Sequence, residues 1–206
     1  MDRDAIKAAV GRISAAMTAN RDYLVELDQR CGDGDLGVTM SGGFAALSAY
    51  LDTAEERDLG RLLMRMASAF NEAAPSSLGT ILSFGMMGMA SALKGRETAG
   101  LADTAAAFQA GVERIMARAG SKPGEKTILD ALCPGAEALQ AAAQAGIDTR
   151  EALERAAQAA AQGAERTRDM IPQHGRAAYY GDKNLGFLDG GAEVGRLIFQ
   201  ALPEPR

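Results

Sequence analysis

Three aspartates lie within eight residues of one another near the N-terminus. They are Asp28, Asp33 and Asp35 in the stretch LDQRCGDGDLGVTM, residues 27–40. The glycines between them let the chain fold back on itself, so the carboxylates can converge. Crowded carboxylates repel one another unless a cation joins them. Mg²⁺ takes a few carboxylate oxygens and completes its octahedron with water and phosphate oxygens. The spacing is therefore compatible with a magnesium–phosphate site.

A helix-like apolar run follows the aspartates at once. Its first residues are Leu36, Gly37, Val38 and Thr39. A helix start presents unpaired backbone N–H groups and the positive end of the helix dipole, both of which favour a bound phosphate. The alternative is that Asp33 and Asp35 are Asx-turn and N-cap residues of an ordinary interhelical turn. Spacing alone leaves both interpretations open.

Three familiar ligand motifs are only approximated. GDGDLG (32–37) matches G-x-G-x-x-G, but a predicted helix precedes it where the dinucleotide fold requires a strand. An EF-hand counted from Asp33 would need glutamate at its twelfth position, which is Phe44. GSKPGEKT (120–127) resembles a P-loop, but it also follows a predicted helix. We exclude all three.

Other polar residues have two interpretations each. Arg176, in a loop of glycines and tyrosines, suits a phosphate clamp or a solvated surface position. Asp189 precedes two glycines and could contact a ligand or cap the last helix. Lys126 and Asp130 are expected to form an i,i+4 helix pair. His174, the sole histidine, is expected to be an exposed loop residue.

Apolar residues recur every three or four positions along most of the chain, which is typical of amphipathic helices. No segment sustains the alternation of a strand, so we predict an all-α protein of about eight helices. Asp58 and Thr149 are expected to cap two of them. The expected helices cover residues 2–27, 38–51, 59–70, 76–93, 103–118, 127–145, 149–170 and 190–202. The long stretch 171–191 between the last two is expected to be an ordered, functional loop.

Composition narrows the class of protein. The 206 residues are 47% hydrophobic and 24% charged, which predicts a single globular domain over residues 1–206. The net charge of -5 argues against nucleic-acid binding. Cys31 and Cys133 form no disulfide framework, and no signal peptide or membrane-spanning run is evident. We therefore expect a cytoplasmic protein that binds neither nucleic acid nor membrane.

Four separated stretches together resemble the nucleotide-binding L subunit of dihydroxyacetone kinases and the equivalent C-terminal domain of single-chain kinases. They are LDQRCGDGDLGVTM, SSLGTILSFG, KPGEKTILDALCP and HGRAAYYGDKNLGFLDGGA. They occur in the order and spacing of that family and span essentially the whole chain. The resemblance implies an antiparallel eight-helix barrel.

The resemblance also implies a set of site residues. In that family three aspartates, matching Asp28, Asp33 and Asp35, hold two Mg²⁺ ions that bridge the phosphates of ADP or ATP. The following helix start, Leu36 to Thr39, contacts phosphate, and the arginine matching Arg176 acts as a catalytic electrostatic clamp. The further nucleotide-binding positions that the resemblance implies are Ser77, Leu78, Gly120, Ile128, Asp189, Gly190 and Gly191.

The sequence departs from the family pattern at three positions and in the turn AAPSSLG, residues 73–79. Leu36 and Phe187 stand where histidine is common, and Gly190 stands where proline is usual. The metal ligands are intact, so nucleotide binding is still expected, while the identity of the sugar stays open between dihydroxyacetone and a tetrose.

The resemblance implies the phosphoryl-donor subunit of a ketose kinase, with little activity alone. A separate K-type subunit would hold the sugar. The nucleotide is either an exchangeable ATP or a resident ADP. A resident ADP would be recharged by a second partner, a phosphotransferase-system M-type subunit. The alternative is a non-catalytic module of the same fold that senses nucleotide and regulates a partner.

Overall fold

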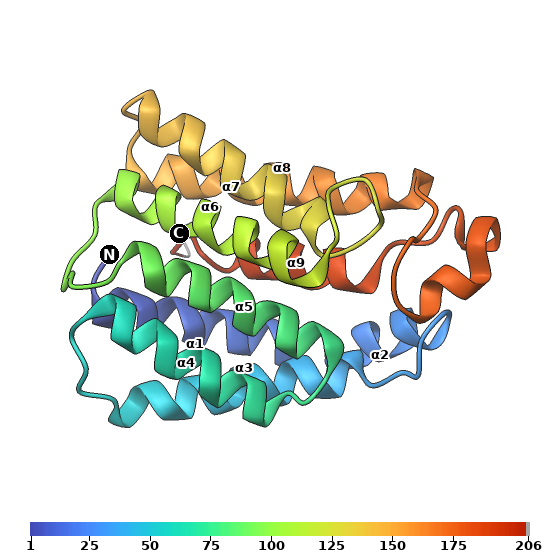
Figure 1. Cartoon of the computed structure of the whole chain (residues 1–206), viewed down its shortest axis with the longest axis horizontal. Coiled ribbons are helices and arrows are strands. Elements are labelled where there is room, and N and C mark those ends of the chain that lie inside the picture. Colours follow the sequence, from blue (N-terminus) through green and yellow to red (C-terminus); the bar gives the residue numbers. More distant parts are fainter. Residues whose placement is uncertain (205–206) are drawn as a thin grey trace.

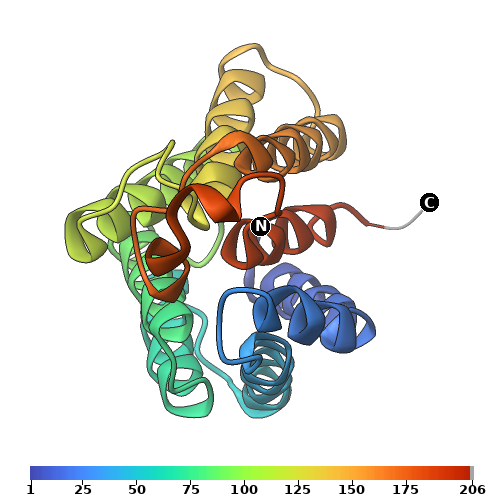
Figure 2. The same ribbon diagram turned by 90° about the vertical axis from the view of Figure 1, so that its right-hand side faces the viewer.

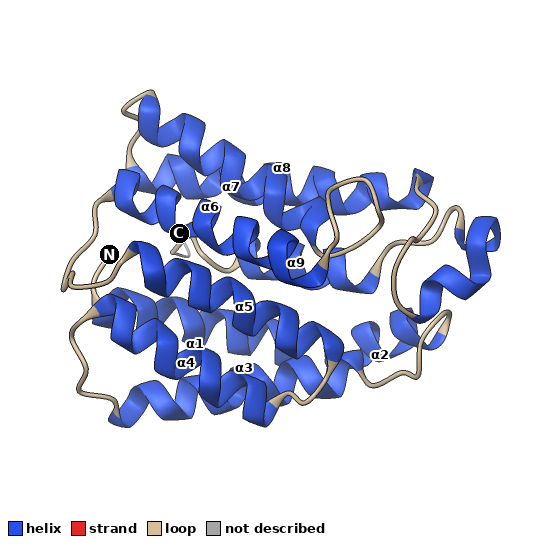
Figure 3. Ribbon diagram, viewed as in Figure 1, coloured by secondary structure: helices blue, strands red, loops and turns tan. Residues whose placement is uncertain are grey.

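The structure, a computed structural model, describes residues 1–204, and in this part of the chain helices joined by loops are present without any strand (Figure 3). The last two residues of the predicted domain 1–206 lie outside the described residues. The α-helices are α1 (Arg3–Ala19), α2 (Arg21–Gln29), α3 (Leu36–Thr53), α4 (Leu59–Ala73), α5 (Ser77–Ala92), α6 (Leu101–Ala119), α7 (Leu129–Gln144), α8 (Thr149–Arg166) and α9 (Gly190–Gln200). Two 3₁₀ segments, η1 (Thr167–Asp169) and η2 (Arg176–Asn184), precede α9.

The long helices run up and down, so successive connections alternate between opposite ends of the molecule (Figure 1). Residues 30–35, 74–76, 120–128 and 167–189 form what we call the loop end, on the right in Figure 1 and facing the viewer in Figure 2. Neighbours along the chain pack closely, as in the pairs α4–α5, α5–α6 and α7–α8. The predicted all-α antiparallel architecture is confirmed.

The first predicted helix, 2–27, is in fact two. The chain leaves helical geometry at Asn20, whose φ and ψ are -104° and 11°, and α2 begins one residue later. The Asn20 side chain donates to the Ala16 carbonyl at 2.8 Å and so satisfies a carbonyl at the end of α1. The apolar stripe continues through the break, since Met17 and Leu24 are both fully buried. Periodicity therefore could not reveal the break.

Short polar side chains begin several helices. Asp58 accepts a hydrogen bond from the Arg61 amide and caps α4, as predicted. The predicted cap Thr149 is wrong, because it already lies within α8. Asp148, in extended geometry, accepts from the amides of Arg150 and Glu151 instead. No helix in residues 1–204 is long and apolar enough to cross a membrane.

Glycine lets α7 and α8 approach closely at the loop end. A Cβ added at Gly163 of α8 would lie 2.0 Å from the Asp130 carbonyl oxygen and 2.7 Å from Pro134 Cγ of α7. A main-chain oxygen cannot yield as the tip of a flexible side chain can, so the site tolerates no side chain. This packing fixes the start of α7 against the end of α8.

We expect Gly163→Ala to lower the free energy of unfolding by on the order of 3 kcal/mol, because the methyl group forces the two backbones apart. Gly11→Ala on α1 is the matched control, since a Cβ there meets nothing within 4 Å. It should raise the free energy of unfolding by about 1 kcal/mol through helix propensity alone. Urea unfolding followed by circular dichroism measures both, and equal effects would contradict the close packing.

Candidate functional site

The three predicted metal ligands converge at the loop end. Asp28 lies in the last turn of α2, Asp33 in the following loop and Asp35 directly before α3. Each offers a carboxylate oxygen, and these atoms lie within 4.8 Å of one another. The loop closes tightly because the Gly34 amide, at a φ of +78°, donates to Asp28 Oδ2 at 2.8 Å. Gly32 allows the close approach, since a Cβ there would lie 2.2 Å from Asp28 Oδ1.

The carboxylates influence one another electrostatically. Burial raises the pKa of Asp35, and repulsion from Asp33 and Asp28 raises it further. The Arg176 guanidinium, which donates to Asp33, lowers the pKa of that exposed carboxyl. A cation among three acidic groups would relieve this repulsion. Three hard oxygen donors on one side of a short loop suit Mg²⁺, which leaves its other positions to water or phosphate.

The start of α3 lies directly beside the carboxylates. Asp35 stands at the N-cap position, as one interpretation predicted, but its side chain makes no capping hydrogen bond with α3. The Leu36 side chain is buried in the core, while Val38 is half exposed. The Thr39 amide already donates to the Asp35 carbonyl at 2.9 Å, so only the Thr39 hydroxyl is left for a ligand. The amides of the first three helical residues are the candidate anion donors.

The segment 171–189 brings Arg176 to the same place. Arg176 begins η2 and forms an ion pair with Asp33, although the two are far apart in the sequence. Both side chains keep exposed surface, at 63% and 47% respectively. An accessible guanidinium beside carboxylates can contact the oxygens of a phosphate that a cation brings to the same site. The stretch 171–191, predicted as an ordered loop without helix, is ordered but partly helical, since 176–184 is 3₁₀-helical with a kink at Gly181 and α9 begins at Gly190.

Four further predicted site residues meet in two pairs at the loop end. A Cβ on Gly190 would lie 2.7 Å from Leu36 Cδ2, so the start of α9 packs against the start of α3. A Cβ on Gly191 would lie 3.3 Å from the Ile128 amide nitrogen, so α9 also lies against the start of α7. Ile128 is buried at 2% exposure. Three stretches that are distant in sequence thus form one surface.

The remaining predicted nucleotide residues lie at the same end but on other helices. Ser77 and Leu78 open α5, which Ser76 caps by accepting from the Gly79 amide at 3.1 Å. Gly120 ends α6 in left-handed geometry, with a φ of 65°. Figure 2, viewed toward the loop end, shows these helix ends on the side of the ring opposite α1 and α2. They could bound a ligand that extends from the carboxylates across the end of the barrel.

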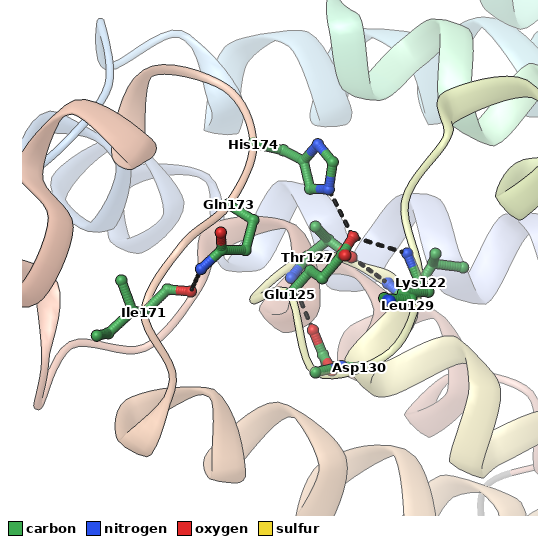
Figure 4. A network of polar contacts seen from close by, with 9 residues as sticks. Lys122, Glu125, Thr127, Leu129, Asp130, Ile171, Gln173 and His174 are labelled. Atoms are coloured by element: carbon green, nitrogen blue, oxygen red, sulfur yellow. Dashed lines mark hydrogen bonds and ion pairs between the residues drawn. The ribbon is translucent and has the colours of Figure 1, made fainter.

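A polar network that the sequence did not reveal joins the 120–128 loop to segment 171–189 (Figure 4). His174 is an exposed loop residue, as predicted, and its Nε2 lies 2.6 Å from Glu125 Oε2. This contact lowers the pKa of Glu125, and the Lys122 amide, which also donates to Glu125, lowers it further. Neither partner carries a sequence signal for the other, because they belong to separate loops.

The predicted helix pair Lys126–Asp130 is wrong. Lys126 lies before α7 with a φ of 60°, and its ammonium donates to the carbonyls of Met170 and Asn184. Asp130 accepts instead from the amides of Gly124 and Thr127, at 2.6 and 2.7 Å. Asp130 therefore shapes the 120–128 loop, and Lys126 reaches into segment 171–189.

Asp189 caps α9, as one of its two interpretations predicted. Its Oδ2 accepts from the Ala192 amide at 2.7 Å. Burial raises the pKa of Asp189 to about 6, although the Ala192 amide acts in the opposite direction, and repulsion from Asp130 adds to the increase. A carboxyl whose pKa is higher in the folded than in the unfolded state makes folding less favourable as the pH rises between the two values.

Asp189→Asn is expected to keep the cap and remove this pH dependence, because the amide oxygen still accepts and carries no charge. Between pH 4 and pH 7, the free energy of unfolding of wild type should fall by on the order of 2 kcal/mol relative to that of the variant. Urea unfolding at both pH values measures this difference. If the difference in free energy of unfolding between the two proteins is the same at both pH values, Asp189 has an ordinary pKa.

Comparison with known proteins identifies a family and several relatives. The family model described as the DAK2 domain matches residues 30–204. The ADP-binding subunit DhaL of the PEP-dependent dihydroxyacetone kinase of Escherichia coli (strain K12) is 26% identical over 191 residues, or 93% of this chain and 91% of that one. The ADP-binding subunit DhaL of PEP-dependent dihydroxyacetone kinase 1 of Listeria innocua is 29% identical, over 89% of this chain and 86% of its own.

A longer relative is L-erythrulose kinase of Pectobacterium atrosepticum, which is 32% identical over 207 residues, or 96% of this chain but 35% of that protein. Among solved structures, dihydroxyacetone kinase of C. freundii in its native form matches with a TM-score of 0.76 and 24% identity, over 96% of this chain and 33% of that one. The same kinase in complex with AMP-PNP and Mg²⁺ gives a TM-score of 0.75. These structural matches show that the helical fold is shared.

Proposed function

Since the chain belongs to the DAK2 domain family, we propose that it is the phosphoryl-donor subunit of a short-ketose kinase. It would act as a single nucleotide-binding domain over residues 1–206, in the cytoplasm, binding Mg·ADP or Mg·ATP. The observation that carries the proposal is the convergence of Asp28, Asp33 and Asp35 within 4.8 Å, with Arg176 and the start of α3 beside them. Two relatives of similar length are named ADP-binding subunits, which supports it.

The proposed roles follow from charge and position. Asp28, Asp33 and Asp35 would hold two Mg²⁺ ions, which when bound neutralise nucleotide phosphates and charge on the transferred group. Arg176, now paired with Asp33, would contact phosphate oxygens and stabilise the charge that develops during transfer. The first amides of α3 would donate to phosphate. Ser77, Leu78, Gly120, Ile128, Asp189, Gly190 and Gly191 would line the rest of the nucleotide site.

The sugar is expected to come from a partner. The sole histidine, His174, pairs with Glu125 in the loop network, and the chain offers no obvious general base for a sugar hydroxyl beside the three carboxylates. As the family resemblance implies, a separate K-type subunit would hold the ketose, and the chain alone would have little activity. A phosphotransferase-system M-type subunit would recharge resident ADP. The relatives of similar length that are named as PEP-dependent kinase subunits support this arrangement.

Reconstitution tests the proposal. We expect no ketose phosphate from the chain with Mg·ATP and dihydroxyacetone, and turnover at least a hundredfold above that background once a K-type subunit is added. Erythrulose in a parallel reaction identifies the preferred sugar. Replacing ATP with phosphoenolpyruvate and the phosphotransferase proteins tests recharging of bound ADP.

The same experiment distinguishes the kinase subunit from a second candidate function. Leu36 and Phe187, where relatives of the family often carry histidine, would fit a module that binds nucleotide and regulates a partner without catalysis. Mg·ADP binding without turnover, in the presence of each K-type subunit and ketose, would establish that alternative. Absence of nucleotide binding would overturn both functions.

A further inference from the structure

One buried lysine holds both ends of the segment that carries Arg176. Lys126 is 3% exposed, and its Nζ donates to the Asn184 carbonyl at 2.8 Å and to the Met170 carbonyl at 3.2 Å. These two carbonyls flank residues 171–183. A single ammonium therefore closes the base of this segment, as a clip would close a loop.

The clip is joined to the carboxylate loop through Asn184. The Asn184 side chain, itself 4% exposed, lies with Nδ2 2.7 Å from Cys31 Sγ, and Cys31 is between Asp28 and Asp33 in the sequence. Arg30 reinforces the junction, because its guanidinium lies 5.5 Å from the centre of the Phe187 ring. The C-terminal end of the segment is thus fixed to the carboxylate loop by two contacts.

The unusual backbone conformation of Lys126 also indicates that the surrounding structure requires this residue in its place. Within residues 1–204, Lys126 is the one non-glycine residue with a positive φ, at 60°. An L-residue pays in strain for that conformation, which is retained where surrounding structure requires it. No carboxylate of the described residues lies within ion-pair distance of the ammonium, so main-chain carbonyls are its direct partners.

We propose that Lys126 is a positioning residue for nucleotide binding and phosphoryl transfer, which acts by holding segment 171–184 so that Arg176 reaches the carboxylate site. The proposal rests on the proposed function in one respect, namely that Arg176 contacts the nucleotide. The buried Lys126 ammonium donates to two main-chain carbonyls at the ends of the segment, so we expect its effect to pass through Arg176.

A double-mutant cycle on Mg·ADP affinity tests this dependence. Lys126→Met keeps the aliphatic stem and removes the donors, and should weaken Mg·ADP binding roughly tenfold in calorimetry. Arg176→Met should weaken it by a similar factor, and the double variant no more than Arg176→Met alone. Lys183→Met, which removes an exposed lysine of the same segment, is the matched control and should bind as wild type.

Hydrogen exchange provides a readout that needs no nucleotide. Amides of residues 171–184 should exchange at least tenfold faster in Lys126→Met, while those of α5 and α6 stay unchanged. If wild type binds no Mg·ADP, the proposed function fails, and exchange alone decides whether Lys126 holds the segment. If Lys126→Met does not fold, Lys126→Gln, which retains a neutral donor, replaces it and should give intermediate effects.

The opposing outcomes are distinct. Additive losses in the double variant would mean that Lys126 has a general structural role and would overturn the proposal. Unchanged exchange in residues 171–184 would overturn it equally, as would faster exchange with wild-type Mg·ADP affinity.

Discussion

Asp33→Ala is expected to abolish the magnesium dependence of ADP binding. In wild type, calorimetry should show tight binding with Mg²⁺ and binding at least a hundredfold weaker in EDTA, since the three carboxylates otherwise repel the phosphates. Without Asp33 the site loses one of three convergent oxygens and the partner of Arg176. Affinity measured with Mg²⁺ should then fall by about a hundredfold or more, close to the value in EDTA.

Asp182→Ala is the control for this experiment, because it removes one exposed negative charge from the same end of the molecule. It should leave both affinities at wild-type values. If wild type binds ADP without Mg²⁺, or if Asp33→Ala binds Mg·ADP as wild type does, the aspartates only shape the turn and bind no metal. The substitution itself should leave helix α3 intact, since Asp33 caps no helix.

Arg176→Met should have its largest effect on turnover. In the reconstituted kinase we expect kcat to fall by about a hundredfold to a thousandfold, because a guanidinium stabilises transferred charge more than it stabilises bound nucleotide. The loss in Mg·ADP affinity should be about tenfold. Arg176→Lys should recover part of kcat, since it restores the charge without the planar pair of donors.

Arg57→Met serves as the charge-matched control, because Arg57 is an exposed arginine in the α3–α4 connection at the opposite end of the barrel. Its kcat should equal that of wild type. If Arg176→Met weakens Mg·ADP binding but leaves kcat unchanged, Arg176 serves nucleotide binding alone.

Much of the fold follows from local sequence. The stripe Ile6, Val10, Ile13 and Met17 predicts the buried face of α1, and all four are buried. Asp58 before an apolar run predicts the start of α4. These predictions succeed because helix periodicity and capping depend on residues within one or two turns.

The carboxylate loop was also accessible from sequence, since Asp28, Asp33 and Asp35 converge through glycines a few residues away. The neighbouring Arg176 was a candidate only by its residue type and, through resemblance, by its motif. Its pairing with Asp33 depends on how segment 171–189 crosses the loop end.

Tertiary packing alone decided the remaining features. The break at Asn20 could not be predicted, because it leaves the apolar stripe intact. The hydrogen bonds of Lys126 could not be predicted either, because their acceptors are the main-chain carbonyls of Met170 and Asn184, which carry no sequence signal. Gly190 meets Leu36, and Gly191 meets Ile128, only because the start of α9 reaches both the start of α3 and the start of α7. Sequence thus determined the helices and the short-range cluster of carboxylates, since both are set by neighbours along the chain. The partners of that cluster were decided by packing, because backbone carbonyls and distant side chains become neighbours only when the barrel closes.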